Sequence, residues 1–501
     1  MEFAFHLIIW CSAVVYSLYN LFLFTRRIDS FITDSTEDFE VGWSVIGRLK
    51  DISDKEWTVW KSFAVSTSPW HLLHFCGAEL FRQNNHRPQI WYIFVSFAFI
   101  LYKLGLNLFC FLTVQPLMYL LILKLGGKSK SIWFSSCLLL VLVDFCKTYY
   151  NYLFIHAYEN NYMLMAVTLW VHLRCLSFSL ETIGIERDVK EKPHKKINGL
   201  EMLNMLSYTF YLPVLFVGPI ILYNDFIKSL DTPYKSSLKR RIFCFASNLT
   251  RYVGWFFFIE FSLHFIYFNA LQYYPQMVEM MPDWSLYGSG LWMGLFFYMK
   301  YLVMYGLSGT LTALDHVEPE TPPRCIARVH RYSQMWKYFD SGLHKFLIRY
   351  IYTPVMRGFV RGSVKWSVMR VFASLACFVF VFFWHGAEKY ILVWTILNYL
   401  GIVLEGLGTS VSQSTWYRRW SEVVLTEPMN NRFNAFLATP ILIMSALSNF
   451  YFFAEYEVGN IYVNRVFNQS LISFIVLFIC MYSSCRVSQR LHQLGARNIL
   501  T

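Results

Sequence analysis

Residues 368–386 read VMRVFASLACFVFVFFWHG, an almost wholly apolar run that ends on a histidine and a glycine. A run of about 18 to 20 apolar residues is long enough to cross the roughly 30 Å hydrocarbon core of a membrane. The run therefore predicts a spanning helix over residues 368–384, with His385 directly at its end. Ionisable groups at membrane depth are costly and usually serve a function, so this imidazole is a candidate site residue.

The rest of the chain has the same apolar character. Of its 501 residues, 56% are hydrophobic and 15% are charged, whereas about 25% are charged in soluble domains. Apolar runs of spanning length recur from residues 3–24 to residues 470–485. We therefore expect an all-α, polytopic membrane protein of about ten to twelve transmembrane helices plus re-entrant segments, folded as one domain over residues 1–501.

The charges are distributed in the way that a membrane topology requires. The formal net charge is +12, but the basic residues lie in short loops between apolar runs, so no nucleic-acid partner is expected. Basic loops stay on the cytosolic side, which predicts cytosolic loops at 124–130, 186–196 and 235–241. The loop that carries Glu279 and Asp283 is acidic and is predicted to be lumenal.

The first apolar run ends at Arg26 and Arg27, which mark a cytosolic helix end by the same rule. We therefore expect residues 26–62 to be a cytosolic segment. Its tryptophans, including Trp43 and Trp57, suit a position at the membrane interface. A signal peptide is the weaker interpretation, because no small-residue cleavage site follows the apolar run.

Two apolar runs are expected to be broken rather than straight. Residues 90–123 are too long for one helix and contain Gly105 and Pro116, so a span followed by a bent or re-entrant piece is predicted. Residues 203–223 lie between two basic loops, so both of their ends should be cytosolic. A path that dips in and returns is predicted there, with the break at residues 213–219, and such backbone persists only where protein or water satisfies it.

A carboxylate is predicted to meet the histidine from the opposite side of the membrane. Residues 308–367 form a cytosolic or re-entrant segment that carries Cys325 and Asp340. His385 begins from the lumenal side, so the two groups can meet only if the segment around Asp340 enters the membrane. A carboxylate and an imidazole are the pair that general acid-base chemistry most often uses.

Each candidate also has a structural interpretation when it is taken alone. Asp340 lies among basic residues and could be a salt-bridge partner, and His385 could be a residue of the membrane interface. Glu260 and Arg251, inside one apparent span, could be a structural pair. The cysteines form no CxxC pair or zinc motif, although Cys485 near a helix end could be acylated.

Several motifs carry a family resemblance. They are Trp336-Lys-Tyr-Phe-Asp340-Ser-Gly-Leu-His344 with Phe346-Leu-Ile-Arg349-Tyr-Ile-Tyr352, Trp384-His385-Gly386, Tyr211 with Pro213 and Gly218-Pro219, Pro323-Arg324-Cys325, and Asn464-Arg465. Over nearly its whole length the chain resembles the membrane-bound O-acyltransferase (MBOAT) superfamily, and within it the Hedgehog acyltransferase branch. Many members of the superfamily have Asn where Asp340 stands, so the aspartate favours this branch.

The resemblance implies an enzyme with the MBOAT fold. It implies transfer of palmitate from palmitoyl-CoA to the N-terminal cysteine of a secreted signalling protein, a Hedgehog or EGF-type ligand, in the membrane of the endoplasmic reticulum or Golgi. His385 would be the general base, and Asp340 would orient the imidazole, stabilise its cation or fix the amine. Direct N-acylation and an S-to-N acyl shift both remain open.

The resemblance also implies further site residues. Cys325 would ligate a haem iron in a structural role. Substrate-contact residues would come from a set spread over two segments of the chain: Trp336, Lys337, His344, Arg349 and Asn449. The alternatives are an acyltransferase that acts on a lipid or a serine, a multipass transporter, and a scaffold without activity.

Overall fold

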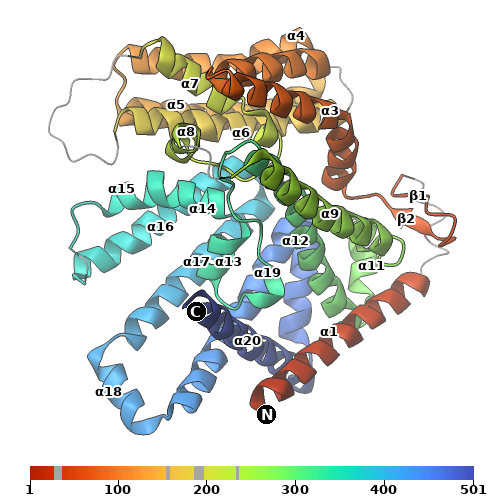
Figure 1. Ribbon diagram of the computed structural model, residues 1–501. Helices are drawn as coiled ribbons and strands as arrows, with labels where there is room; N and C mark the ends of the chain where they lie inside the picture. The colour runs from red at the N-terminus through yellow and green to blue at the C-terminus, as the bar shows by residue number, and fades with distance from the viewer. Residues whose placement is uncertain (28–36, 154–157, 185–196, 233–235, 361, 501) are drawn as a thin grey trace.

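The computed structural model in Figure 1 describes the whole chain except residues 28–36, 154–157, 185–196, 233–235, 361 and 501. The described part is almost entirely helical, which confirms the predicted all-α class. The predicted basic loop at 186–196 lies outside the described residues. Eight described helices are long and apolar enough to cross a membrane. They are α1 (Glu2–Arg27), α4 (Pro88–Lys124), α6 (Tyr158–Thr182), α9 (Leu238–Ser262), α16 (Val364–His385), α17 (Lys389–Ser412), α19 (Glu427–Asn468) and α20 (Leu471–Leu500).

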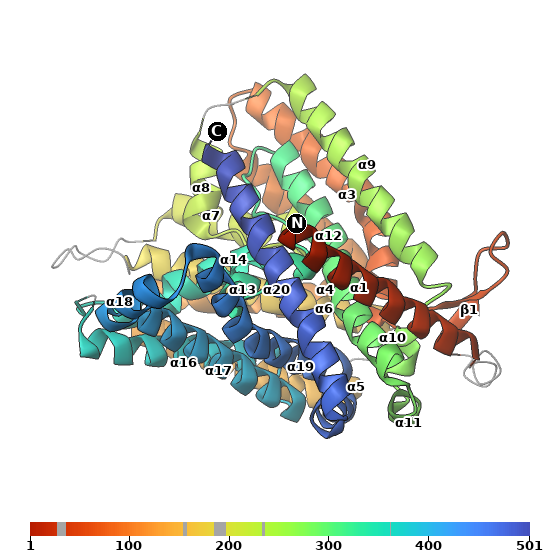
Figure 2. The same cartoon turned by 90° about the horizontal axis from the view of Figure 1, so that it is seen from below.

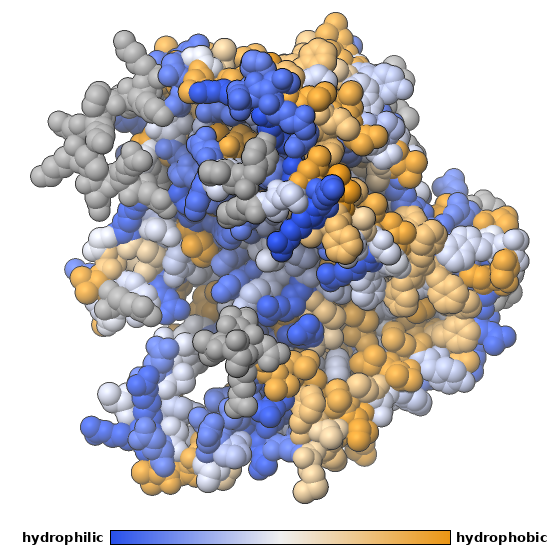
Figure 3. Space-filling model, in the orientation of Figure 1, coloured by the Kyte–Doolittle hydropathy of each residue, from blue (hydrophilic) through white to orange (hydrophobic). Residues whose placement is uncertain are grey.

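Apolar side chains cover much of the outer surface, as expected for a protein surrounded by lipid. Figure 3 shows them in orange over the face that α1 occupies. Exposed examples on α1 are Phe5, Ile8 and Val15, which are 61%, 66% and 67% accessible. In water such a surface would be a strong association site, so it is consistent with a membrane environment.

The central helix is α12 (Asp283–Leu314), which packs against α1, α9 and α19. Small residues allow these close approaches, since a Cβ at Gly288 would overlap the backbone of Ser17 on α1. A Cβ at Gly306 would likewise overlap the ring of Tyr252 on α9. Small residues are the usual solution where membrane helices touch. α12 carries a buried charged residue, Lys300, in its middle.

The remaining elements are shorter or more polar. They are β1 (Phe39–Val41), β2 (Leu49–Asp51), α3 (Lys55–Gln83), α5 (Ser129–Leu153), α7 (Gly199–Thr209), η1 (Leu212–Val214), α8 (Tyr223–Asp231), α10 (Phe268–Leu271), α11 (Pro275–Glu279), η2 (Ile326–Arg328), α13 (Tyr332–Phe339), α14 (Ser341–Leu347), η3 (Ile348–Tyr352), α15 (Thr353–Met356) and α18 (Thr415–Val424). β1 and β2 pair antiparallel. The π-helical turn η3 continues α14 directly.

Both predicted breaks are present. α4 is interrupted at Gly105, whose φ of 81° lies in the left-handed region that favours glycine. Residues 210–222 join α7 to α8 with no α-helix and are buried throughout except at Val217. A third break, which the sequence analysis did not predict, divides α19 at Ala454 and Glu455.

The structure places residues 38–54 at one end of the bundle, beside the loop that joins α9 to α12. The Asp51 carboxylate is buried there and accepts the Ala270 N–H at 3.0 Å. The prediction of a cytosolic 26–62 segment and that of a lumenal loop around Glu279 therefore cannot both be right. The cytosolic prediction rested on the two arginines at the end of α1, which are a local signal. The contact between Asp51 and Ala270 joins residues more than 200 positions apart, so no local signal could predict it.

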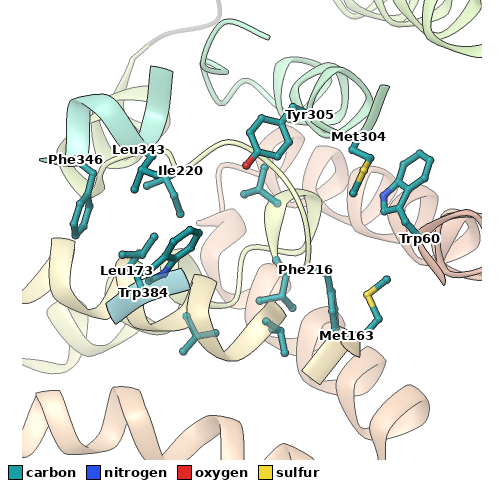
Figure 4. Close-up of a cluster of buried hydrophobic side chains, with 14 of the residues drawn as sticks. Trp60, Met163, Leu173, Phe216, Ile220, Met304, Tyr305, Leu343, Phe346 and Trp384 are labelled. Carbon is teal, nitrogen blue, oxygen red and sulfur yellow. The ribbon is translucent and has the colours of Figure 1, made fainter. Parts of the chain in front are cut away.

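Figure 2 views the bundle from below, and α1 and α20 cross there in front of α12. Glu2, the first residue of α1, accepts from Arg486 in the middle of α20 at 2.9 Å and from Arg432 near the start of α19 at 2.9 and 3.0 Å. The core beneath is continuous and rich in aromatic rings. Figure 4 shows part of it, where Tyr305, Leu343 and Trp384 come from three different helices.

Candidate active site

One cavity of about 370 Å³ lies beside α12. One face of α12 lines it through Trp284, Tyr287, Gly290, Leu291, Gly294, Phe297, Tyr301 and Tyr305. From the first to the last of these is 21 residues, or about 32 Å at 1.5 Å per helical residue. The cavity therefore extends over about the thickness of the hydrocarbon core. Asp340 and His385 both line it.

Asp340 stands between two short helices and caps the second. Its backbone, at φ −124° and ψ 89°, is not helical, so α13 ends before it and α14 begins after it. Its Oδ1 accepts the Leu343 N–H at 2.8 Å, and its Oδ2 accepts the Tyr305 hydroxyl at 3.0 Å. Burial raises the pKa of this carboxyl, and these two hydrogen bonds oppose the rise. The carboxylate is therefore held in one orientation.

His385 is the last residue of α16 and lies in an aromatic cage. The rings of Trp384, Trp394 and Phe452 meet it edge to face at 4.8, 5.4 and 5.2 Å. Gly386 ends the helix with φ 104° and ψ 137°, a conformation that residues with a Cβ rarely adopt. This explains physically why glycine follows the histidine: the chain must turn sharply at the point where the ring faces the cavity.

Within the part of the chain that the structure describes, His385 makes no side-chain hydrogen bond or ion pair, either with Asp340 or with another residue. Its ring nitrogens are thus available to a substrate in the cavity. Asp340 therefore does not orient the imidazole directly, which was one of the three roles considered for it. The arrangement leaves room for a reacting group between the carboxylate and the imidazole.

The irregular segment 210–222 holds both candidate groups in place. A Cβ on Gly342 in α14 would overlap the Ile220 backbone, so the helix that Asp340 caps lies directly on this segment. On its other side, the Trp170 indole N–H donates to the Gly218 carbonyl at 2.8 Å. The Trp170 ring stacks on Trp384 at 5.2 Å, next to His385. The predicted break thus positions the site without contributing a reactive group.

Of the other predicted contact residues, three line the cavity: Trp336, His344 and Asn449. The Trp336 indole N–H donates to Asn398 at 3.2 Å, and Asn449 accepts from the Trp394 indole at 3.1 Å. Asn449 therefore also supports the aromatic cage around the histidine.

Two predicted contact residues do not line the cavity. Lys337 is exposed, with its ammonium 5.4 Å from the centre of the Tyr338 ring. Arg349 forms an ion pair with Glu181. Both positions lie outside the cavity wall, so any substrate contact by either would have to be made elsewhere.

Cys325 is half-buried on the turn before η2. It does not line the cavity, although the next two residues do. Burial raises the pKa of its thiol, and the nearby Arg328 guanidinium and the Ala327 N–H oppose the rise. Among the described residues, no cluster of three or more His, Cys, Asp or Glu side chains could hold a metal ion.

The proposed pairing of Glu260 with Arg251 is wrong. Glu260 instead lies 2.7 Å from the Lys50 ammonium and 3.0 Å from that of Lys61. Arg251 stacks on the ring of Tyr252 at 5.5 Å. The partners of Glu260 come from the chain before and within α3, so spacing within one helix could not reveal them.

Several site residues were missed by the sequence analysis. Tyr301 and Tyr305 line the cavity, and Trp394 and Phe452 form the cage. A signal for the first pair was present, because Lys300 interrupts the apolar run 286–307, and a charge there usually has a partner and a role.

Comparisons with known proteins identify the family of this chain. The profile of the membrane-bound O-acyltransferase family matches residues 120–448, a stretch that includes Asp340 and His385. The chain belongs to this family. It is 28% identical over 490 residues to the protein-cysteine N-palmitoyltransferase Rasp of Drosophila melanogaster. The aligned region covers 96% of this chain and 93% of that protein.

Two other relatives are informative. The chain is 29% identical over 468 residues to the protein-cysteine N-palmitoyltransferase HHAT of Mus musculus, covering 90% of each protein. It is 28% identical over 227 residues to the membrane-bound O-acyltransferase GUP1 of Saccharomyces cerevisiae, covering 44% of this chain and 38% of that protein. Similarity over nearly the full length is therefore found with two proteins named as N-palmitoyltransferases.

Proposed function

We propose that this protein is a protein-cysteine N-palmitoyltransferase that moves palmitate from palmitoyl-CoA to the N-terminal cysteine of a secreted protein. The observation that carries the proposal is a single cavity, about as long as the membrane is thick, with a carboxylate and an unbonded imidazole on its wall. The donor is cytosolic and the acceptor lumenal, so the reaction needs a passage of this kind. The similarity to Rasp and HHAT supports the identity of both substrates.

His385 and Asp340 have separate roles in the proposed reaction. An α-amine has a pKa of about 8, so it is largely protonated at neutral pH, and only the neutral amine is nucleophilic. His385 takes a proton as the nitrogen attacks the thioester carbonyl. The new C–N bond forms, the C–S bond breaks, and the leaving thiolate takes a proton to become free CoA. Asp340, which lacks contact with the imidazole, would fix the incoming amine by charge and hydrogen bonding.

The donor would be held partly by charge at the cavity edge. Arg331 is exposed and lines the cavity, and the nearby Arg324 guanidinium stacks on the Tyr338 ring at 3.8 Å. Guanidinium groups form strong charge-assisted hydrogen bonds with phosphate oxygens. We propose that these arginines receive the CoA phosphates while the apolar cavity wall receives the acyl chain.

The test is transfer of labelled palmitate from CoA to synthetic peptides by the purified protein. Three peptides share one sequence but differ at the start: cysteine with a free amine, serine with a free amine, and cysteine with an acetylated amine. The proposal predicts a stable, hydroxylamine-resistant product with the first peptide only. Equal labelling of the serine peptide, or of a lipid in place of any peptide, would favour an O-acyltransferase, and no labelling at all would favour a transporter or scaffold.

The acceptor class and the compartment belong to the same proposal. A Hedgehog-like or EGF-type ligand enters the secretory pathway, and the enzyme would meet it in the membrane of the endoplasmic reticulum or the Golgi. The eight helices of spanning length support a membrane location, because such helices require insertion into a membrane. Co-expression with such ligands in cells, followed by mass spectrometry of their N-termini, tests the acceptor class directly.

We also propose that Cys325 holds a haem. The residues fit: the thiol is a soft donor that is not bonded in a disulfide, and the Arg328 guanidinium near it is a cation that would pair with a propionate. When bound, the haem would supply a structural iron–sulfur link and no step of acyl transfer. A Soret band in the purified protein that is lost in Cys325→Ser tests this, and an unchanged absorbance spectrum in the variant would contradict it.

A further inference from the structure

Two tyrosine hydroxyls on one face of α12 bond two different carboxylates, Asp340 on the cavity wall and Glu56 behind it. The Tyr305 hydroxyl, which donates to Asp340, belongs to α12. One turn earlier on the same face, the Tyr301 hydroxyl donates to Glu56 Oε1 at 2.9 Å. The two tyrosine rings lie edge to face with centroids 5.2 Å apart. Both tyrosines line the cavity, whereas Glu56, in the first turn of α3, does not.

Glu56 belongs to a buried ion cluster behind the cavity wall. The Lys300 ammonium lies 2.7 Å from Glu56 and 2.8 Å from Asp54, and the Tyr162 hydroxyl also donates to Glu56 at 2.7 Å. The Lys300 side chain is 6% accessible, whereas those of Asp54 and Glu56 are 18% and 22% accessible. The two carboxylates are therefore more accessible than the ammonium that they share. Two carboxylates share the one ammonium of Lys300. Protonation of one carboxylate therefore leaves the other paired with the ammonium, with no net charge among the three groups.

The reaction needs an exit for a proton. A neutral amine and a thioester give an amide and a thiol with no proton left over. An ammonium and a thioester give the same two products and one proton. At neutral pH most acceptor termini are ammonium ions, because the pKa of an α-amine is about 8. A charge left in an apolar cavity is costly, so this proton must be removed during each turnover.

We propose that Tyr305, Tyr301 and Glu56 form the route by which the proton of the acceptor ammonium leaves the cavity. This inference rests on the proposed function. Asp340 accepts the proton from the ammonium. No direct hydrogen bond joins the Tyr305 and Tyr301 hydroxyls among the described residues, so a bridging water completes the route. Asp340 passes a proton to the Tyr305 oxygen as Tyr305 gives its own to this water, the water gives one to Tyr301, and Tyr301 gives its own to the Glu56 carboxylate. Both tyrosines end neutral, Asp340 is again ionised, and Glu56 releases the proton to solvent.

The other titratable and charged groups near this route do not offer the same exit. They are Glu320 and Lys345 beside Asp340, His344 and His385 on the cavity wall, and Asp54, Lys300 and Tyr162 around Glu56. Glu320 already lies 2.7 Å from the Lys345 ammonium, so that pair is neutral as it stands. The structural alternative is an ion cluster that only braces α3 against α12. The two interpretations differ in how a variant responds to pH.

The test compares kcat for palmitoyl transfer to the free-amine cysteine peptide from about pH 6 to about pH 9.5. Tyr301→Phe keeps the ring contacts but removes the hydroxyl that bonds Glu56, and Glu56→Gln removes the proton acceptor. We expect kcat in each to fall at least about tenfold near pH 6.5, where the amine is protonated, and to approach the wild-type value above about pH 9, where it is neutral. Glu56→Asp should restore part of the loss.

Tyr208→Phe is the matched control, because that hydroxyl is also buried and donates at 2.7 Å, to the Ile221 carbonyl, but lies away from the cavity. Its kcat should fall equally at every pH or not at all. A pH-independent loss in Tyr301→Phe, or no loss, would overturn the route. Should Glu56→Gln not fold, Tyr301→Phe decides alone. Absence of transfer by the wild-type protein is a different result and would contradict the proposed function instead.

Discussion

Replacing Asp340 by Asn and by Ala separates its charge from its helix-capping role. The carboxylate makes two hydrogen bonds, one that caps α14 and one from Tyr305. Asn keeps an acceptor for the Leu343 N–H, and its amide can donate to the Tyr305 oxygen, so the free energy of unfolding should change by less than about 0.5 kcal/mol. Ala loses the cap, worth about 1 kcal/mol. It also leaves the buried tyrosine hydroxyl unbonded, at a further cost of about 1 to 3 kcal/mol.

Although Asp340→Ala should be less stable than Asp340→Asn, the two variants should lose activity to a similar extent. Both variants lack the charge, so we expect turnover in each to fall at least about a hundredfold, the usual scale for an acid-base group. The assay is transfer of labelled palmitate to the cysteine peptide, paired with thermal unfolding in detergent. A fully active Asp340→Asn with a stability close to wild type would refute the reasoning, because Asp340 would then act only as a helix cap.

Three further predictions follow from individual residues. His385→Ala should lower turnover at least about a hundredfold without unfolding the protein, and wild-type turnover in a folded variant would remove the imidazole from the mechanism. Gly386→Ala should destabilise the protein by about 1 kcal/mol or more, because its φ of 104° is strained for Ala; an unchanged melting temperature would contradict this. Burial raises the pKa of Asp51 to about 7, above the pKa of the same group in the unfolded chain. The protonated carboxyl therefore contributes to the free energy of unfolding fully below the unfolded-chain pKa, and this contribution should be lost as pH rises through about 7. Asp51→Asn should flatten this dependence in melting curves taken from pH 5 to pH 9, and an equally steep curve in the variant would show another group to be responsible.

The sequence allowed the helical architecture to be predicted because apolar runs of spanning length depend on local composition alone. The end of α16 at His385 was predicted in this way, and so was the break in α4 at Gly105. The side of the membrane on which residues 26–62 lie stays a prediction. It rested on two arginines, whereas the segment's position is fixed by its contacts with the loop after α9, which no local pattern encodes.

The candidate pair of Asp340 and His385 was predicted from motifs, and the residues that hold it in place were not. That Asp340 and His385 would share a cavity followed from the need for the two substrates to meet. The contacts that hold them come from distant parts of the chain: Trp170 lies on α6 and stacks on Trp384, and Tyr305 lies on α12 and bonds Asp340. Aromatic residues make up 19% of this sequence, so no single tryptophan or tyrosine could be distinguished before the fold was known.

The central claim is that donor and acceptor meet in one cavity between Asp340 and His385. The most direct measurement is a cryo-EM map of the protein with a bisubstrate analogue that joins palmitoyl-CoA to the peptide's N-terminus. The account predicts density for the joining carbon in the cavity, with the adjoining nitrogen within hydrogen-bond reach of His385 and on the side of Asp340. Density for the analogue outside the cavity beside α12, or with its joining carbon remote from both residues, would contradict the account.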